Sequence, residues 1–466
     1  MRKGLILIFC LLLASFPALA DESPAFLPPT CTEPGYILHE ENGSIRPEET
    51  DPPLGHDYRD GICARCGEKQ GNILLDSLPR IEFTGSMEGM SRERRIPLAC
   101  ALILPEGDYA CYSFTTFQGH STMEFEKKNF TLRFFQDARI TEKFRISFRN
   151  WRSEHKYILK AHYQDVSVSR NLIAAGVWAD MAASRENLPR QLQSSSSFGA
   201  VSGFPVTVWL NGEFLGLYTL NLHKDEDLFA MNGVKREAIV ICNSETLPEA
   251  LFLAPASFLE ESDWELEYCG TGNGAWAEKS FNELIAFVME SDDDTFKARL
   301  HEYLDTDAAI DYLLFLYALG LSHSGAKDLV MIKYENTPWL PSAYDMEEAF
   351  GLDLEKGAYL PPDAFLPVKT ETGWNSGTGS LLWDRLLSLF EGEIRQRYLF
   401  LREHALSEES LLARAKAHLA AIPDEIIRED LNLYPVRPAP TEGYRTQILQ
   451  YIENRLPLLD HALLEE

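Results

Sequence analysis

Residues 320–352 constrain the fold more than any other part of the chain, because they carry polar and acidic residues across a helix end and two short strands. Residues 311–321, DYLLFLYALGL, are mostly apolar and predict a buried helix that ends at Gly320. The runs VMIKYEN and PWLPSAY then predict two strands joined by a turn at residues 335–337. This hairpin delivers Asp345 at its end.

Residues 1–20 have the three parts of a secretory signal peptide. Arg2 and Lys3 precede an apolar run, and Ala18-Leu19-Ala20 supplies a small-residue cleavage site before Asp21. An uncleaved anchor helix is the alternative, and the short apolar run disfavours it. We therefore expect a mature chain that begins at Asp21, is secreted or held at the cell surface, and has no membrane span.

The charge of the chain disfavours nucleic acid as a partner. The formal net charge is −28 at pH 7, and it becomes −30 once the two cations of the leader are removed. Such a surface repels nucleic acid and anionic lipid, and no basic patch is visible in the sequence. The hydrophobic content of 45% predicts a globular chain.

A small cysteine module is expected at residues 21–72. Cys63 and Cys66 form a knuckle, and Cys31 and His56 can complete a Cys3His zinc site. A disulfide, either Cys63–Cys66 or Cys31–Cys66, and an eroded module remain as alternatives. Eight cysteines less Cys10 of the leader leave an odd number, so at least one thiol is free, metal-bound or intermolecular.

Residues 73–466 are expected to form one main domain that begins with antiparallel sheet. Several runs between residues 81 and 135 alternate apolar and polar side chains, as half-buried strands do. Cys100 and Cys111 flank the predicted turn LPEGDY. They either face each other across two strands or are simple buried thiols.

A glycine-containing loop precedes two lysines within this sheet. Gly119 and Ser121 lie in the loop, and Lys127 and Lys128 follow at the start of the next strand. A loop of this kind can wrap phosphates with backbone N–H groups and one ammonium. A plain hairpin loop has the same composition.

A second candidate phosphate contact follows in the chain. Lys160 lies near the end of the predicted strand YILKA, and Asp165 precedes a helix expected to begin near Val166. A strand lysine that pairs with an acid on the following helix orients nucleotide phosphates in kinases. A surface lysine and a helix-capping aspartate explain the same residues without a ligand. Lys128 and Lys160 compete for the phosphate contact, and we rank Lys128 first.

The remainder of the chain predicts one more hairpin and a series of helices. Asn211-Gly212 is a strong turn signal between the alternating strands of residues 206–222. Helical patterns cover residues 276–315, 381–412 and 443–464, and the acidic run 290–294 is typical of a solvated helix N-terminus. The fold class is therefore α+β.

These motifs, in this order, resemble the CotH-like kinases, the family of spore coat protein H, in its secreted bacterial branch. Two sequence motifs of the family, L-K-A-x-x-x-D-x-x-x-x-R-N and N-G-E-x-x-G-x-Y, have counterparts here. The resemblance implies an atypical protein-kinase-like fold with two lobes, an antiparallel N-lobe sheet and a mostly helical C-lobe. It also implies ATP, Mg²⁺ or Mn²⁺, and phosphoryl transfer to protein hydroxyls. It assigns ATP binding to Gly119, Ser121, Lys128, Lys160 and Asp165, and metal binding to Asp328, Asp345 and Glu347.

The catalytic segment departs from the family pattern G-x-x-D-N-x-G-K-N, hairpin, Y-D-M-D-S-x-F-G. His323 stands where the family has the catalytic Asp, Asp328 where it has Asn, and Glu347 where it has its second Asp. A neutral imidazole, with an unperturbed pKa of about 6.5, can accept a proton but supplies no negative charge. Three hypotheses follow: an active secreted kinase, a pseudokinase, and an extracellular binding protein that uses the fold as a scaffold.

If the cysteine module binds zinc, metal analysis of the mature chain should find about one Zn²⁺ per molecule, as a Cys3His site requires. Substitution Cys63→Ser should remove it. Absence of zinc together with no free thiol among Cys31, Cys63 and Cys66 would favour disulfides instead.

Overall fold

The computed structural model describes residues 78–465, apart from residues 106, 120, 150, 234, 244–250, 259–261 and 372, and the backbone of five short strands between residues 25 and 63. The chain divides into two units, Met1–His56 and Asp57–Glu466. In the first unit, β1 (Ala25–Leu27), β2 (Gly35–Glu41) and β3 (Ser44–Asp51) form an antiparallel sheet. In the second, β4 (Tyr58–Arg59) pairs with β5 (Ile62–Cys63).

The four candidate zinc ligands lie outside what the structure describes. Cys31, His56 and Cys66 are not among the described residues, and Cys63 is described only as part of the backbone of β5. The zinc site and the domain limits 21–72 and 73–466 therefore stay predictions.

Seven strands of the second unit close into a barrel with the order β10-β12-β11-β6-β7-β8-β9. Every neighbouring pair is antiparallel except β6 and β11, which run parallel and close the barrel. The strands are β6 (Arg80–Thr84), β7 (Ile96–Leu104), β8 (Gly107–Gln118), β9 (Asn129–Phe135), β10 (Lys156–Lys160), β11 (Gly203–Leu210) and β12 (Glu213–Leu222).

The sequence correctly predicted the local features of this barrel. The antiparallel strands before residue 135 are confirmed, and so is the turn between β11 and β12, where Asn211 (φ 53°) and Gly212 (φ 82°) both have positive φ. Cys100 and Cys111 are direct register partners on β7 and β8 and are buried, free thiols. Closure into a barrel differs from the expected N-lobe sheet, because the β6–β11 pairing joins strands far apart in the sequence.

A second, four-stranded sheet has the order β14-β13-β15-β16. Its strands are β13 (Ala238–Cys242), β14 (Trp264–Cys269), β15 (Val330–Lys333) and β16 (Leu340–Ser342). The β15–β16 hairpin is the one predicted before Asp345, so that prediction is confirmed. Two small hairpins follow, β17 (Leu352–Asp353) with β18 (Ala358–Tyr359), and β19 (Val368–Thr370) with β20 (Gly373–Asn375).

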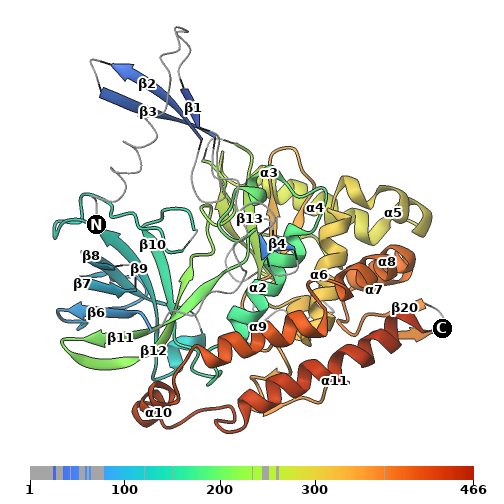
Figure 1. Cartoon of the computed structure of the whole chain (residues 1–466). Helices are drawn as coiled ribbons and strands as arrows, with labels where there is room; N and C mark the ends of the chain where they lie inside the picture. Colours follow the sequence, from blue (N-terminus) through green and yellow to red (C-terminus); the bar gives the residue numbers. More distant parts are fainter. Residues whose placement is uncertain are drawn as a thin grey trace, which may run out of the picture. The chain divides into compact units, whose positions relative to one another are not determined.

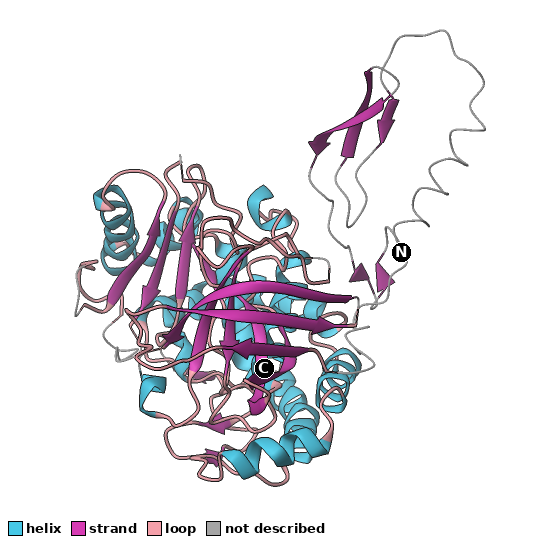
Figure 2. Cartoon of the chain, turned by 90° about the vertical axis from the view of Figure 1, so that its left-hand side faces the viewer, coloured by secondary structure: helices cyan, strands magenta, loops and turns pink. Residues whose placement is uncertain are grey.

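Helices form the rest of the second unit, so the α+β class is confirmed. Figure 1 shows the barrel strands on one side and α4–α8 on the other, with α9 packed along α11, and Figure 2 shows helices around the edges of the strands. The α-helices are α2 (Arg170–Ala183), α3 (Arg190–Gln193), α4 (Ala275–Glu290), α5 (Asp293–Arg299), α6 (Thr306–Leu319), α7 (Leu381–Leu389), α8 (Glu391–Arg402), α9 (Glu408–Ala420), α10 (Asp424–Leu433) and α11 (Tyr444–Leu464).

Helix α6 is the centre of the helical part, and it sets the position of the segment that follows it. Twelve consecutive residues from Ala308 to Leu319 are buried, and the Asp305 side chain caps the first turn by accepting from the Ala308 N–H at 2.8 Å. Gly320 ends the helix with φ 69°, a conformation that glycine adopts without a steric penalty. The predicted helix end is confirmed, and the chain turns directly into His323.

One helix prediction was wrong, and one helix was missed. Helix α2 begins at Arg170 rather than near Val166, because Val168 has φ 53° and the Asp165 side chain binds Ser167 instead of continuing a helix. Helix α10 was not predicted, since its sequence DEIIREDLNL is mostly polar.

Among the described residues, no helix combines the length and apolar character that a bilayer span requires.

A buried ion-pair cluster fixes α6 against its neighbours. Asp311 of α6 is fully buried and accepts two hydrogen bonds from Arg397 of α8, at 2.7 and 3.0 Å, while Arg185 Nε lies 3.3 Å from it. Burial raises the pKa of Asp311 above its ordinary value in spite of both arginines. The carboxylate is therefore costly to bury and strongly dependent on its partners.

Substitution Asp311→Asn should lower the free energy of unfolding by about 3–5 kcal/mol, because it removes the carboxylate that the buried Arg185 and the half-buried Arg397 share. The control Glu290→Gln, at an exposed position of α4, should change it by less than about 0.5 kcal/mol. Chemical denaturation of both variants measures the difference. Equal stabilities would show that the cluster does not fix α6.

Candidate functional site

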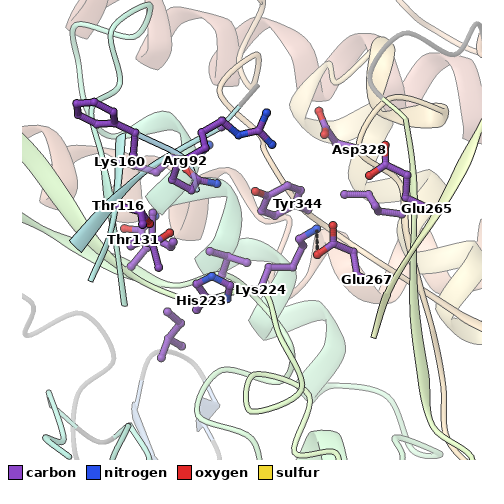
Figure 3. Close-up of a pocket in the computed structure, with 18 of the residues that line it drawn as sticks. Arg92, Thr116, Thr131, Lys160, His223, Lys224, Glu265, Glu267, Asp328 and Tyr344 are labelled. Carbon is purple, nitrogen blue, oxygen red and sulfur yellow. Dashed lines mark ion pairs between the residues drawn. The ribbon is translucent and has the colours of Figure 1, made fainter. Parts of the chain in front are cut away.

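A cavity of about 770 Å³ lies between the barrel and the second sheet. One wall is the outer face of β8, β9, β10 and β12, where alternate residues point away from the barrel core. On β9, for example, Phe130 and Leu132 are buried in the barrel, while Thr131 and Arg133 line the cavity. Figure 3 shows Lys160 and Arg92 on one side of the cavity, with Asp328 and Glu265 facing them.

Lys160 of the barrel contacts residues 345–350, an acidic turn that follows β16. Its ammonium forms an ion pair with Asp345 Oδ1 and lies 3.7 Å from Glu347 Oε1. Burial alone would lower the pKa of Lys160, but the charges of Asp345 and Glu347 outweigh it and hold that pKa above its ordinary value. Lys160 is therefore a permanent cation at the cavity wall.

The start of α2 holds the acidic turn in place. Arg170 donates to the carbonyl oxygens of Ala349 and Phe350 at 2.6 and 3.2 Å, and the Asn171 side chain accepts from the Met346 N–H at 2.7 Å. All of these groups are buried, so the bonds are costly to break. The R-N pair of the sequence motif thus positions the turn that carries Asp345.

His162 is a member of the site that sequence reasoning missed. Its Nδ1 lies 3.1 Å from Glu347 Oε1, and its Nε2 is 2.7 Å from Thr219 Oγ1. Burial would raise the pKa of Glu347, but Lys160 and then His162 lower it below the ordinary range. Glu347 is consequently held as a carboxylate against the barrel wall.

Asp328 lines the same cavity and has a conformation that few aspartates adopt, with φ 59°. Burial, and next the negative charge of Asp345, raise the pKa of Asp328 above its ordinary value. Two carboxylates that repel each other in this way are stabilised by a cation between them.

The carboxylates fit a divalent cation that also binds phosphate. Among the described residues, no group of three or more His, Cys, Asp or Glu could hold a metal alone. Mg²⁺ does not need such a cage, since it is commonly bound through one or two carboxylates, water and substrate phosphates. Asp328 lines the cavity and Asp345 pairs with Lys160 at its wall, so these two carboxylates are the candidate ligands.

The predicted phosphate loop contributes backbone to the cavity. Gly119 lines it with φ 102°, and a Cβ there would meet Thr122 Oγ1 at 1.9 Å, so the turn requires glycine. The side chain of Ser121 lies outside the described residues. Lys128 is turned into the loop, where it donates to the carbonyl oxygens of Met123 (2.7 Å) and Phe125.

Of the two competing lysines, Lys160 is the one that lines the cavity. Lys127, the other member of the lysine pair, is buried against Asp430 of α10 at 2.8 Å, and burial lowers the pKa of Lys127 to about 8. It fixes α10 to the barrel. The sequence ranks Lys128 first for the phosphate contact, but Lys160 is the lysine that reaches the cavity.

The expected ion pair between Lys160 and Asp165 is replaced by another arrangement. Asp165 is buried, receives a hydrogen bond from Ser167 Oγ at 2.6 Å and lies 3.3 Å from Arg170 Nε. Asp345 and Glu347 take the place beside Lys160. Asp165 therefore contacts Arg170, and Arg170 in turn holds the acidic turn.

His323 begins a short 3-10 turn, His323–Gly325, directly after α6. Its side chain is 39% exposed, and its Nδ1 lies 3.1 Å from Glu348 Oε1. This hydrogen bond raises the pKa of His323 above its ordinary value, against the opposing effect of burial. His323 is not among the residues that line the cavity.

Three residues that line the cavity were missed for one shared reason. Arg133, Glu265 and Glu267 line the cavity from β9 and β14. Their polar side chains alternate with apolar ones, so the sequence shows that each faces away from a core. It does not show that the two outer faces meet.

The CotH kinase protein family model matches residues 115–459 of the chain, about three-quarters of its length. The chain therefore belongs to the CotH kinase family. No curated protein matches it.

Substitution Asp328→Asn should stabilise the metal-free protein at about pH 8, by roughly 1–3 kcal/mol. The raised pKa means that the folded state binds the proton more tightly than the unfolded state does. Stability is consequently lost as pH rises through the folded pKa, and Asn has no charge to bury.

Thermal unfolding with and without Mg²⁺ or Mn²⁺ measures this effect. Added metal should raise the melting temperature of wild type more than that of Asp328→Asn. A variant that is less stable than wild type at pH 8 without metal would contradict the proposed repulsion between Asp328 and Asp345.

Proposed function

We propose that this chain is an atypical protein kinase that uses ATP and Mg²⁺ or Mn²⁺ to phosphorylate protein hydroxyls. The observation that carries the proposal is the buried Lys160, bound to Asp345 at the wall of a nucleotide-sized cavity that Asp328 also lines. A fixed cation beside two carboxylates is what phosphoryl transfer requires, because the reaction depends on positioning and charge stabilisation.

The residues divide into those that would bind phosphate and those that would bind metal. Lys160 supplies a positive charge, and Gly119 brings its backbone to the cavity wall. Asp345 and Asp328 are the proposed metal ligands. A bound divalent metal would neutralise charge on the phosphates during transfer.

Glu347 has a supporting role in this proposal. Its carboxylate faces Lys160 and His162, both of which hold it in the charged form. It balances the charge of Lys160 when Asp345 turns toward a metal. Without Glu347, a buried lysine would lose its remaining partner, at a cost of several kcal/mol.

His323 is the proposed acceptor of the proton from the substrate hydroxyl. It is partly exposed and directly follows α6, whose burial fixes its backbone. Neutral imidazole is the usual general base near neutral pH. The raised pKa of His323 means that this base is available only once the pH exceeds its ordinary titration range.

The kinase-like arrangement of two lobes is part of the proposal. The barrel would take the position of the N-lobe and the α4–α9 and α11 bundle that of the C-lobe, with the cavity next to Lys160. The leader peptide at residues 1–20 supports a secreted or cell-surface location for the enzyme.

A pseudokinase, or a binding protein built on this scaffold, is the second candidate. The observation that favours it is the histidine at position 323, which supplies no negative charge and does not line the cavity. Such a protein would keep the Lys160–Asp345 pair for binding alone.

Transfer of radiolabelled phosphate from ATP to the chain itself or to a generic protein substrate tests the proposal. Lys160→Met and Asp345→Asn should each lower the rate by about 10²–10³-fold, because each removes a charge that acts on the transferred group. Lys279→Met, at an exposed position of α4, is the matched control and should leave the rate unchanged.

The outcomes separate the two candidates. Wild type that raises its melting temperature with ATP and metal but transfers nothing is the pseudokinase. Wild type with neither response is a scaffold protein, and the proposed ATP site is then wrong.

A further inference from the structure

We propose that Glu348 is a positioning residue for His323, which it holds in the tautomer that leaves Nε2 free to accept a proton. The catalytic consequence of this pairing rests on the proposed kinase function, but the tautomer itself does not. Neither the family match nor the sequence motifs assign a role to Glu348.

The contact is between a buried carboxylate and a partly exposed imidazole. Glu348 Oε1 lies 3.1 Å from His323 Nδ1, and the two side chains are 10% and 39% exposed. A buried carboxylate is unfavourable unless it receives hydrogen bonds. A proton on His323 Nδ1 gives Glu348 such a bond, and the imidazole remains partly exposed.

The chemistry of imidazole makes this contact decisive. Neutral histidine carries one N–H, and in water the proton resides mainly on Nε2. A carboxylate at Nδ1 reverses this preference, because it can only accept a hydrogen bond. The same carboxylate stabilises the imidazolium that forms when Nε2 takes up a proton, as in the carboxylate–histidine pairs of hydrolases.

The acidic turn directs its two adjacent glutamates to different partners. Glu347 faces Lys160 and His162, whereas Glu348 faces His323. The Phe350 N–H donates to the Leu319 carbonyl at 2.7 Å, which ties the turn to the end of α6. The turn that carries the metal-binding Asp345 therefore also fixes the base.

The sequence changes at both ends of this contact. The family pattern places Asp at position 323 and Ser at position 348, and this chain has His and Glu. Relative to the family pattern, this chain lacks a carboxylate at position 323 and has one at position 348. Oε1 of that Glu348 lies 3.1 Å from His323 Nδ1. The pair keeps a negative charge at the site while an imidazole becomes the group that meets the substrate.

In the proposed transfer step, His323 is the proton acceptor. The substrate hydroxyl oxygen forms a bond to the γ-phosphorus of ATP while the bond from that phosphorus to the bridging oxygen breaks and releases ADP. The hydroxyl proton passes to Nε2 of His323. The adjacent Glu348 carboxylate balances the imidazolium charge.

The tautomer can be measured directly by ¹⁵N NMR of the full chain labelled at histidine, at about pH 9 where imidazole is neutral. His323→Gln identifies the signal. Wild type should show Nδ1 protonated and Nε2 unprotonated. Glu348→Gln keeps an acceptor and should retain this tautomer, whereas Glu348→Leu should revert to the Nε2–H form that predominates in water.

The catalytic consequence needs a kinetic readout in the same proteins. Glu348→Leu should lower kcat by about 10²-fold and leave the KM for ATP unchanged, because Glu348 does not line the cavity. His323→Asp alone places a carboxylate next to Glu348 and should be slower than the double variant His323→Asp/Glu348→Ser, which restores the family pair.

Three results would overturn the proposal: His323 in the Nε2–H tautomer in wild type, a tautomer that Glu348→Leu leaves unchanged, or a folded Glu348→Leu protein with wild-type kcat. Failure of the kinase proposal looks different. In that case wild type transfers no phosphate, while the NMR result still decides whether Glu348 positions His323.

Discussion

The ion pair between Lys160 and Asp345 is the interaction on which the site depends. It joins two residues 185 positions apart in the sequence, one at the end of a barrel strand and the other after the β15–β16 hairpin. Lys160 is buried, so loss of its acidic partners would leave an uncompensated charge in the protein. This contact ties the acidic turn, which Arg170 and Asn171 also hold, to the wall of the cavity.

Adjacent acidic residues have distinct environments in this site, and that division gives each a separate role. Asp345 and Glu347 face the cation, Asp328 is destabilised by its carboxylate neighbour, and Glu348 meets an imidazole. Buried bonds from Arg170 and Asn171 hold the turn that carries Asp345, Glu347 and Glu348. The fixed position of this turn is part of the proposed mechanism.

Local sequence patterns predicted the elements of the site but not their assembly. The helix end at Gly320, the hairpin before Asp345 and the Asn211-Gly212 turn each follow from a few neighbouring residues, and all are confirmed. Closure of the barrel through the parallel β6–β11 pair depends on residues more than 100 positions apart, and no local pattern specifies it. The same limit explains the lysines. Residue type cannot show that Lys128 turns into its own loop while Lys160 lines the cavity.

A crystal structure with Mg²⁺ and a non-hydrolysable ATP analogue tests the central claim most directly, namely that this cavity binds a metal–nucleotide complex. The account predicts phosphates next to Lys160 and Gly119, and a metal that contacts Asp345 and Asp328. It also predicts that Lys160 keeps Glu347 as a partner when Asp345 turns to the metal. A nucleotide bound elsewhere, or a metal without Asp345 among its ligands, would contradict it.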